Sequence, residues 1–203
     1  MDTNERREQE KLERKNKIME AALQLFSEKD FHEVTVDEIA ERVSLSKGTL
    51  YLYFENKDNL FFSIITSKWN YLIELLLKVL ETERPFEECL RDYINLYLSF
   101  FDRHSSFFKI VHSEKSRLVM EHENKMREWA IEINNKILRI VGQIIENGQR
   151  QKIVRNISPE GASVILHGML NSYVFQRIFW GSNVTIDQDT DQVVDIFLNG
   201  IKA

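Results

Sequence analysis

Apolar residues recur every three or four positions over most of the chain, which is the spacing of one face of an α-helix. Only two prolines and seven glycines interrupt the 203 residues. The pattern therefore predicts an all-α protein. The helices that we expect cover residues 18–29, 36–43, 47–54, 58–81, 86–103, 107–112, 114–147, 159–180 and 189–201.

Two short helices are predicted next to each other near the amino terminus. Thr35 and Glu38 have the spacing of a capping box at the start of residues 36–43, and Ser46 can cap residues 47–54. Helices this short cannot bury enough apolar surface alone and must pack on neighbours. This is the arrangement of a helix-turn-helix, in which the second helix enters the major groove of DNA.

The second of these helices has an unusual outer face. Leu50 and Phe54 lie four residues apart and are expected in the core, which leaves a Tyr-Leu-Tyr run facing outward. Such a run is costly on a surface unless it touches a partner. Hydroxyl, aromatic and lysine side chains can contact phosphates and base edges, and glycine permits close approach of the backbone. Our candidate DNA contacts are Thr35, Ser46, Lys47, Gly48, Thr49, Tyr51, Leu52, Tyr53 and Lys57.

The same stretch carries a family resemblance. Thr35, Ile39-Ala40, the run LSKGTLYLYF at residues 45–54 and Asn56-Lys57 resemble the signature of the TetR family of bacterial transcriptional regulators. Residues 18–26 are similar to the first helix of that family. The motifs cover about the first third of the chain and are specific, because several fixed spacings agree at once.

Two positions depart from the family pattern. Ser44 stands where the family usually has glycine in the turn, and Asp30 stands where a glycine usually follows the first helix. Both residue types tolerate turn geometry, so we expect the fold to be preserved. If these changes alter the fold, we expect them to alter the tilt of the recognition helix.

Composition fits a soluble globular protein, with 43% hydrophobic and 29% charged residues. The net charge of −5 argues against a general nucleic-acid coat, although a specific DNA-binding protein needs positive charge only at its contact surface. Cys89 is the only cysteine, the amino terminus does not resemble a secretory signal, and no run of 18 apolar residues occurs. We expect a cytoplasmic location and no membrane contact.

The first fourteen residues mix arginine and lysine with glutamate. One interpretation is a solvated helix start that has no partner. The other is an arm that touches DNA phosphates or the minor groove. The sequence leaves both open.

The resemblance implies two domains, a DNA-binding domain at residues 1–57 and a ligand-binding and dimerisation domain at residues 58–203. In that family the helix that we predict at residues 58–81 links ligand to DNA. A rigid helix shared by two domains can carry a small tilt from one to the other.

The carboxy-terminal helices are rich in aromatic side chains, and the family architecture implies a pocket among them. A core role is the alternative for each residue, above all for the histidines. An acyl chain or acyl thioester, a flat aromatic drug, or another hydrophobic compound remain open as effectors, and we expect no cofactor. The candidate ligand-binding residues are Trp69, Tyr97, Phe101, His104, Phe108, His112, Met126, Trp129, His167, Asn171, Phe175 and Arg177.

Family members are generally homodimers that associate through their last two long helices. The corresponding helices here, at residues 159–180 and 189–201, carry broad apolar faces of their own. A two-fold dimer would place two recognition helices in successive major grooves of a palindrome, about 34 Å apart. Packing within one chain is the alternative use of these faces.

Two other classes of function were weighed. The sequence has no glycine-rich phosphate loop, nucleophile elbow or paired cysteines, and Glu121-His122-Glu123 would fan apart on a helix, so we expect neither catalytic residues nor a metal site. A helical module that binds protein through residues 51–54 would lack the steep salt dependence of a DNA-binding protein. The favoured hypothesis is a ligand-responsive repressor, with activation as the alternative sign of regulation.

Overall fold

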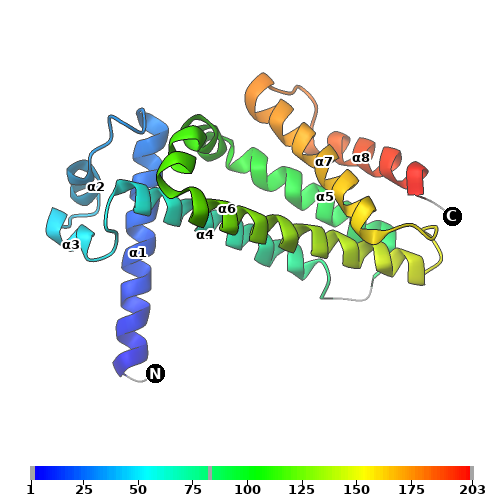
Figure 1. The fold of residues 1–203 in the computed structure, drawn as a ribbon, viewed down its shortest axis with the longest axis horizontal. Helices are drawn as coiled ribbons and strands as arrows, with labels where there is room; N and C mark the ends of the chain where they lie inside the picture. The colour runs from blue at the N-terminus through cyan, green and yellow to red at the C-terminus, as the bar shows by residue number, and fades with distance from the viewer. Residues whose placement is uncertain (1–2, 82–83, 202–203) are drawn as a thin grey trace. The chain divides into compact units, whose positions relative to one another are not determined.

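The computed structural model describes residues 3–81 and 84–201, and within the helices it leaves the side chains of residue 3 and residues 114–124 undescribed. The described part of the chain is helical and contains no β-strand, which confirms the predicted all-α class (Figure 1). The elements in order are α1 (Thr3–Glu28), α2 (Val36–Arg42), α3 (Lys47–Tyr51), α4 (Lys57–Lys78), α5 (Phe86–Arg103), α6 (Ser105–Arg150), α7 (Pro159–Phe175), the π-helix η1 (Gln176–Trp180) and α8 (Ile186–Ile201).

The chain forms two compact units. The first comprises Met1–Lys68 with Ile110–Leu118, and the second comprises Trp69–Lys109 with Val119–Ala203. Helices α4 and α6 are each continuous and contribute residues to both units. Our boundary after residue 57 was drawn on expected function, and it stays a prediction.

The core of the first unit is built from one face of each of its helices. Ile18, Ile39, Leu50 and Leu60, from α1, α2, α3 and α4, are at most 1% exposed. Leu50 and Phe54 are both buried, as expected. The buried face of α1 consists of Ile18, Ala21, Ala22, Leu25 and Phe26. The rings of Phe26, Phe31 and Phe61 pack together, with centroids 4.9 to 5.5 Å apart. This aromatic cluster fixes the loop before α2 against α1 and α4.

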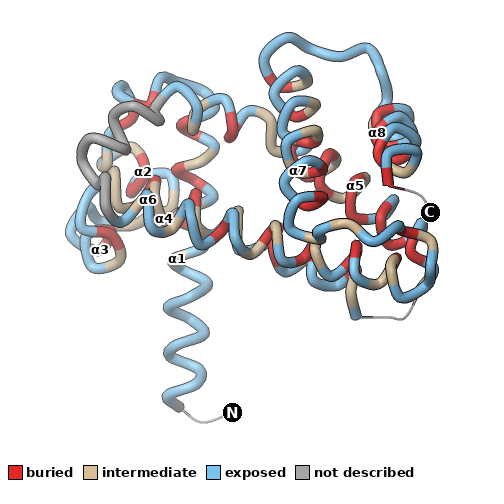
Figure 2. The backbone as a smooth tube through the Cα atoms, turned by 45° about the vertical axis from the view of Figure 1, so that its right-hand side comes forward, coloured by how far each residue is buried: buried red, intermediate tan, exposed pale blue. Residues whose placement is uncertain are grey.

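Helix α5 is the centre of the second unit. It packs against both α7 and α8, and its residues Leu90, Tyr93, Ile94, Tyr97 and Leu98 have no exposed surface. Figure 2 shows this buried face as a red stripe along α5 that meets red segments of α7 and α8. The core of this unit is completed by residues such as Val141, Ile145, Leu166, Leu170 and Val193.

Two predicted helices differ from the structure. Residues 107–112 and 114–147 belong to one helix, α6, because neither proline nor glycine stands at residue 113 to break it. Gly148, predicted to end that helix, lies inside it. Helix α3 ends at Tyr51, three residues earlier than expected, and Leu52 and Tyr53 form the turn that follows.

The end of α7 is tied to its neighbours by Arg177. Ser158 caps the start of α7, accepting a hydrogen bond from the Gly161 N–H at 3.1 Å. The helix then widens into η1, which ends at Gly181 with φ of 78°. From η1, the guanidinium of Arg177 forms ion pairs with Asp102 of α5 at 3.1 Å and Asp189 of α8 at 2.6 Å.

Helix α4 is long and apolar enough to cross a membrane by length and composition alone. Core helices of globular proteins pass the same test. Here Leu60, Phe61, Ile64 and Ile65 are buried in the first unit, and Leu72 and Leu76 are buried in the second. Burial within the fold therefore accounts for the apolar character of α4.

Candidate DNA-binding surface and ligand site

Helices α2 and α3 are both set by side-chain caps. The hydroxyl of Thr35 accepts from the Glu38 N–H at 3.2 Å and the Glu38 carboxylate accepts from the Thr35 N–H at 2.8 Å, which is the predicted capping box. Ser46 Oγ accepts from the Thr49 N–H at 3.1 Å. Two of our candidate contacts, Thr35 and Ser46, thus already stabilise the helix starts.

The turn between the two helices contains a strained residue. Ser44 has φ of 55°, in the left-handed region that favours glycine. The structure therefore explains why a glycine is usual at this position, and it shows that serine adopts the same conformation here. Asp30, the other departure from the family pattern, accepts a hydrogen bond from the His32 N–H through Oδ1 at 2.8 Å.

Helix α3 presents a mixed polar and apolar surface to solvent. Lys47 and Gly48 are exposed, and Tyr51 and Leu52 are 44% and 80% exposed. Thr49 and Tyr53 are half-buried. A Cβ added at Gly48 would meet only Ser46 Oγ, at 3.9 Å, so the surface is open beside this backbone. The outer face of α3 therefore has the hydroxyls, the cation and the accessible backbone that contact with a duplex requires.

The cation of this surface has an acidic neighbour that the sequence reading did not single out. Lys47 Nζ lies 2.6 Å from Asp37 Oδ2, and both side chains are more than half exposed. The hydrogen bond to Asp37 raises the pKa of Lys47. Asp37 and Lys47 are ten residues apart on different helices, so helical spacing alone could not have paired them.

Lys57 is placed differently from our expectation. Its ammonium donates to the carbonyl oxygens of Phe31 at 2.7 Å and Val34 at 2.9 Å, and it lies 4.4 Å from the centroid of the Phe31 ring. The side chain thus closes the loop before α2. A role of Lys57 in gripping a phosphate stays a prediction.

Four predicted ligand-binding residues gather in one aromatic cluster of the second unit. The Trp69 ring packs edge-on against Phe101, Phe108 and Trp129, with centroids 5.5, 6.0 and 6.4 Å away. Phe101 and Phe108 are buried, while Trp69 and Trp129 are half-buried. The sequence could supply these residue types, but only the fold brings α4, α5 and α6 together at this point.

A second group of candidates adds polar atoms beside that cluster. Tyr97 packs against Phe101 at 4.9 Å, donates to Asn171 Oδ1 at 2.8 Å, and meets the ring of His167 edge-on. Burial raises the pKa of Tyr97 and lowers that of His167. His167 Nδ1 is buried and has no hydrogen-bond partner among the described residues. The hydroxyl of Tyr93, which is not among the candidate ligand-binding residues, is also buried and has no hydrogen-bond partner among the described residues.

The remaining candidates have varied surroundings. His104 packs on Phe100, His112 is exposed, Arg177 is held by its carboxylates, and Phe175 is 40% exposed and packs on Phe179 and Trp180. Met126 is half-buried. Ligand binding by these five residues stays a prediction, and their positions give Arg177 a structural role.

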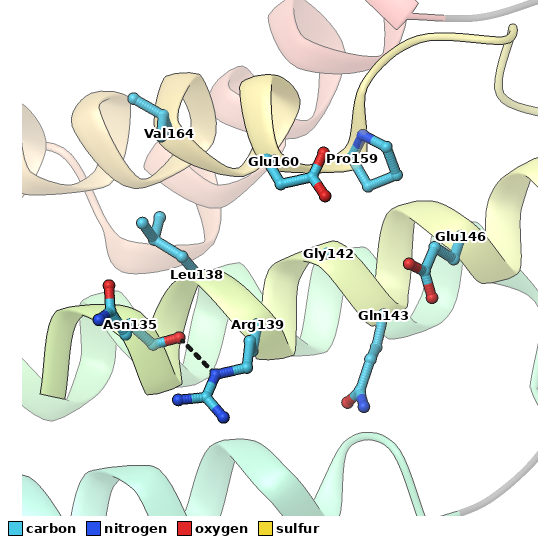
Figure 3. A pocket seen from close by; sticks show the side chains of 9 residues that line it. All are labelled: Asn135, Leu138, Arg139, Gly142, Gln143, Glu146, Pro159, Glu160 and Val164. Carbon is cyan, nitrogen blue, oxygen red and sulfur yellow. Dashed lines mark hydrogen bonds between the residues drawn. The ribbon is translucent and has the colours of Figure 1, made fainter. Parts of the chain in front are cut away.

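A groove of about 510 Å³ lies between α6 and α7 (Figure 3). In Figure 3 the Arg139 side chain extends from α6 away from α7, and its Nε donates to the Asn135 carbonyl at 3.3 Å. The residues that line it are Asn135, Leu138, Arg139, Gly142, Gln143, Glu146, Pro159, Glu160 and Val164. Both polar and apolar side chains line it, and none of our ligand candidates is among them.

Comparisons with known proteins agree with this arrangement. The model of the family described as "Bacterial regulatory proteins, tetR family" matches residues 18–64, the segment that contains α2 and α3. The fatty acid metabolism regulator protein of Bacillus subtilis is 22% identical over 185 residues, 91% of this chain and 93% of that protein. The biofilm operon negative transcriptional regulator IcaR of Staphylococcus epidermidis is 36% identical over 64 residues, 32% of this chain and 35% of that protein.

Solved structures show the same fold over the whole chain. The transcriptional regulator FadR of Bacillus subtilis, determined in complex with stearoyl-CoA, superposes with a TM-score of 0.71 at 23% identity. The match covers 91% of this chain and 98% of that one. The helix-turn-helix geometry, the family match at residues 18–64 and the fold over the remaining helices lead to one conclusion: the chain belongs to the TetR family of bacterial transcriptional regulators.

Proposed function

We propose that the protein binds a palindromic DNA operator as a homodimer through α3, and that a hydrophobic small molecule in the second unit releases it. The observation that carries the DNA part is the exposed face of α3, where a lysine, an open glycine backbone and two large side chains stand together. We propose repression as the sign of regulation, in the cytoplasm where operator DNA is found. Activation would need only a different operator position relative to the promoter.

The dimer proposal is supported by an exposed stripe along α7. Gly161, Val164, Ile165, Gly168 and Phe175 recur at helical spacing, and all five are exposed in the single chain. A Cβ at Gly168 would meet nothing within 4 Å. On α8, Ile196 is 52% exposed. Small residues between apolar ones permit close helix packing, so a second copy would cover this stripe and remove its apolar surface from water.

The effector proposal rests on the two groups of residues around Tyr97. The Trp69 cluster offers an apolar wall, and the buried Tyr93 hydroxyl and His167 Nδ1 lack partners among the described residues. Buried polar atoms without partners are rare, and a ligand is one way to satisfy them. A hydrophobic chain with a hydrogen-bonding group fits both features. Because a structural relative binds stearoyl-CoA, a long-chain acyl-CoA is the first compound to test.

Helix α4 supplies the proposed coupling between effector and DNA. It is one continuous helix from Lys57 to Lys78, Leu60 and Phe61 anchor it in the first unit, and Trp69 joins the aromatic cluster of the second. A ligand that moved Trp69 would tilt the helix. That tilt would change the separation of the two α3 helices in a dimer and weaken operator binding.

The DNA part is tested by operator selection followed by substitution on α3. Duplexes selected from a random pool by the full-length protein would provide the operator. Lys47→Ala and Tyr53→Ala are each expected to lower operator affinity by about 1–3 kcal/mol, or roughly fivefold to 150-fold. Tyr71→Ala is the matched control, because Tyr71 is 50% exposed and belongs to the other unit. Unchanged operator affinity in both the Lys47 variant on α3 and the Tyr53 variant in the turn after it would show that the assigned surface is wrong.

The effector part is tested by titration with stearoyl-CoA, with coenzyme A alone as the control. Binding near Trp69 and Trp129 should change tryptophan fluorescence, and the Trp180→Phe variant removes the signal of a side chain that is 77% exposed. Operator affinity should fall as the acyl-CoA site fills. A fluorescence change without any change in operator affinity would contradict the coupling. If stearoyl-CoA changes neither the fluorescence nor the operator affinity, long-chain acyl-CoA compounds are excluded as effectors.

A further inference from the structure

The amino-terminal half of α1 is a helix that projects from the unit that contains it. Residues 4–14 are helical and all exposed, and burial begins at Ile18. Figures 1 and 2 both show this part of α1 running on past α2 and α3 with no segment of the first unit beside it. At a rise of about 1.5 Å per residue, the exposed portion is roughly 16 Å long.

One face of this projection is basic. Arg7, Lys11 and Arg14 precede Ile18 by eleven, seven and four residues, so all three lie on the side of α1 that is buried further along the helix. We call Arg7, Lys11 and Arg14 the basic stripe. Lys15, four residues after Lys11, lies with Nζ 5.6 Å from the centroid of the Phe54 ring, just after α3. The basic stripe therefore continues the side of α1 that faces the helix-turn-helix.

A neighbouring face of the same helix is electrically balanced. Arg6, Glu10, Glu13 and Lys17 follow each other at helical spacing, and Arg6 pairs with Glu10 at 2.9 Å. The three side chains of the basic stripe have no ion-pair partner among the described residues. Positive charge is thus concentrated on one side of the projection and neutralised on another.

The lysines and arginines nearest the helix-turn-helix are already engaged within the protein. Between residues 29 and 57 there are four, and each has an internal partner: Lys29 with Glu38, Arg42 with Glu28, Lys47 with Asp37, and Lys57 with two carbonyl oxygens. A DNA-binding unit with its central cations engaged in this way needs others to meet phosphate charge. The basic stripe supplies them.

We infer that the basic stripe is a second DNA contact, which grips the phosphate backbone of the same duplex beside the bases that α3 contacts. This inference rests on the proposed function of α3. Arg7 and Arg14 are about 10 Å apart along the helix axis, so the stripe meets more than one phosphate. Contacts to phosphate carry no base information, and the stripe therefore adds affinity and salt dependence to operator and non-operator DNA alike.

The test compares two double variants of the full-length protein that remove the same charge from different faces of α1. R7Q/K11Q removes two residues of the basic stripe, and R6Q/K17Q removes two from the balanced face. Glutamine has a helix propensity close to those of arginine and lysine, so α1 is preserved in both, which circular dichroism checks. Affinity for a random-sequence duplex and for the selected operator is measured over a range of salt concentrations.

The basic stripe predicts that R7Q/K11Q lowers the slope of log affinity against log salt by about two per protomer on both duplexes, whereas R6Q/K17Q leaves the slope near that of the unsubstituted protein. Equal changes in the two variants would mean that only net charge matters and would overturn the inference. Unchanged binding by R7Q/K11Q, with operator binding still lost in Tyr53→Ala, would overturn it while the proposed function of α3 stands. Failure of the unsubstituted protein to bind any duplex would overturn both.

Discussion

Lys47 and Asp37 form an ion pair across the turn of the helix-turn-helix, with Nζ and Oδ2 2.6 Å apart. The lysine begins α3 and the aspartate is in the first turn of α2. An exposed pair of this kind contributes little to stability, because water and salt screen the two charges. Its larger consequence concerns the proposed DNA contact, in which Lys47 would share its charge between Asp37 and a phosphate or base, and Asp37 would repel the duplex.

Replacing Asp37 should therefore strengthen DNA binding in general. Asp37→Asn is expected to raise affinity for duplexes of any sequence and to steepen the salt dependence by about one unit of slope, since one more lysine becomes available to phosphate. Filter binding across salt concentrations measures both. Glu41→Gln removes the same charge one turn along α2 and is the control. An equal gain in the control would show that the Lys47 pair has no specific effect.

The left-handed conformation of Ser44 is expected to lower the stability of the folded protein. Ser44→Gly should raise the free energy of unfolding by about 0.5–1 kcal/mol, because glycine adopts positive φ without the steric cost that serine carries. Ser44→Ala keeps that cost and should give no gain. Urea unfolding of the three proteins decides this, and a glycine variant no more stable than the alanine variant would mean that the turn is not strained.

Gly148 should be intolerant of a side chain. A Cβ at this position would lie 2.6 Å from Val154 Cγ2 and 2.7 Å from Phe86 Cδ2. Gly148→Ala is expected to lower the free energy of unfolding by about 1–3 kcal/mol, the usual range for overpacking. Gly142→Ala in the same helix would meet only Ser163 Oγ at 3.6 Å and should be neutral or stabilising. Equal thermal shifts in the two variants would contradict the close contact.

The lowered pKa of Glu38 predicts the direction in which the free energy of unfolding changes with pH. Its hydrogen bonds, first with Lys29 and then with Thr35, lower its pKa from 4.5 to about 2. A depressed folded-state pKa means that the stabilisation is present above pH 4.5 and is lost as the pH falls through about 2. Glu38→Gln keeps the capping hydrogen bond and removes the charge.

Urea unfolding of the unsubstituted protein and of Glu38→Gln should therefore show a difference that is constant above about pH 5. The difference should shrink as the pH falls from 4.5 towards 2. A difference that stayed the same over that interval would show that the Lys29 and Thr35 contacts do not hold the carboxylate in solution.

Local patterns in the sequence predicted the features that depend on local physics. The capping box of Thr35 and Glu38, the Ser46 cap and the burial of Leu50 and Phe54 were all confirmed. Each follows from hydrogen bonds or periodicity within a few residues. The same reasoning failed at residue 113, where a helix break was assumed without a residue that breaks helices.

Features that depend on distant residues could not be predicted in this way. Gly148 directly follows the predicted end of a helix at residue 147, but it lies inside α6. Phe86 and Val154 approach it so closely that no Cβ atom fits there. Ligand binding by Arg177 stays a prediction, but its ion pairs with Asp102 and Asp189 could not be predicted, because these residues come from two other helices. DNA contact by Lys57 stays a prediction, but its hydrogen bonds to loop carbonyls more than twenty residues away could not be predicted from local spacing.

The central claim is that the outer face of α3 contacts a duplex, and Gly48→Ala tests it most directly. In the free protein an added methyl group has open space, and alanine is favoured over glycine in a helix by about 0.5–1 kcal/mol, so the thermal midpoint should hold or rise. If the backbone of Gly48 lies close to the DNA, the same methyl group should lower affinity for the selected operator by roughly tenfold or more. A variant that is equally stable and binds that operator as tightly as the unsubstituted protein would contradict the claim.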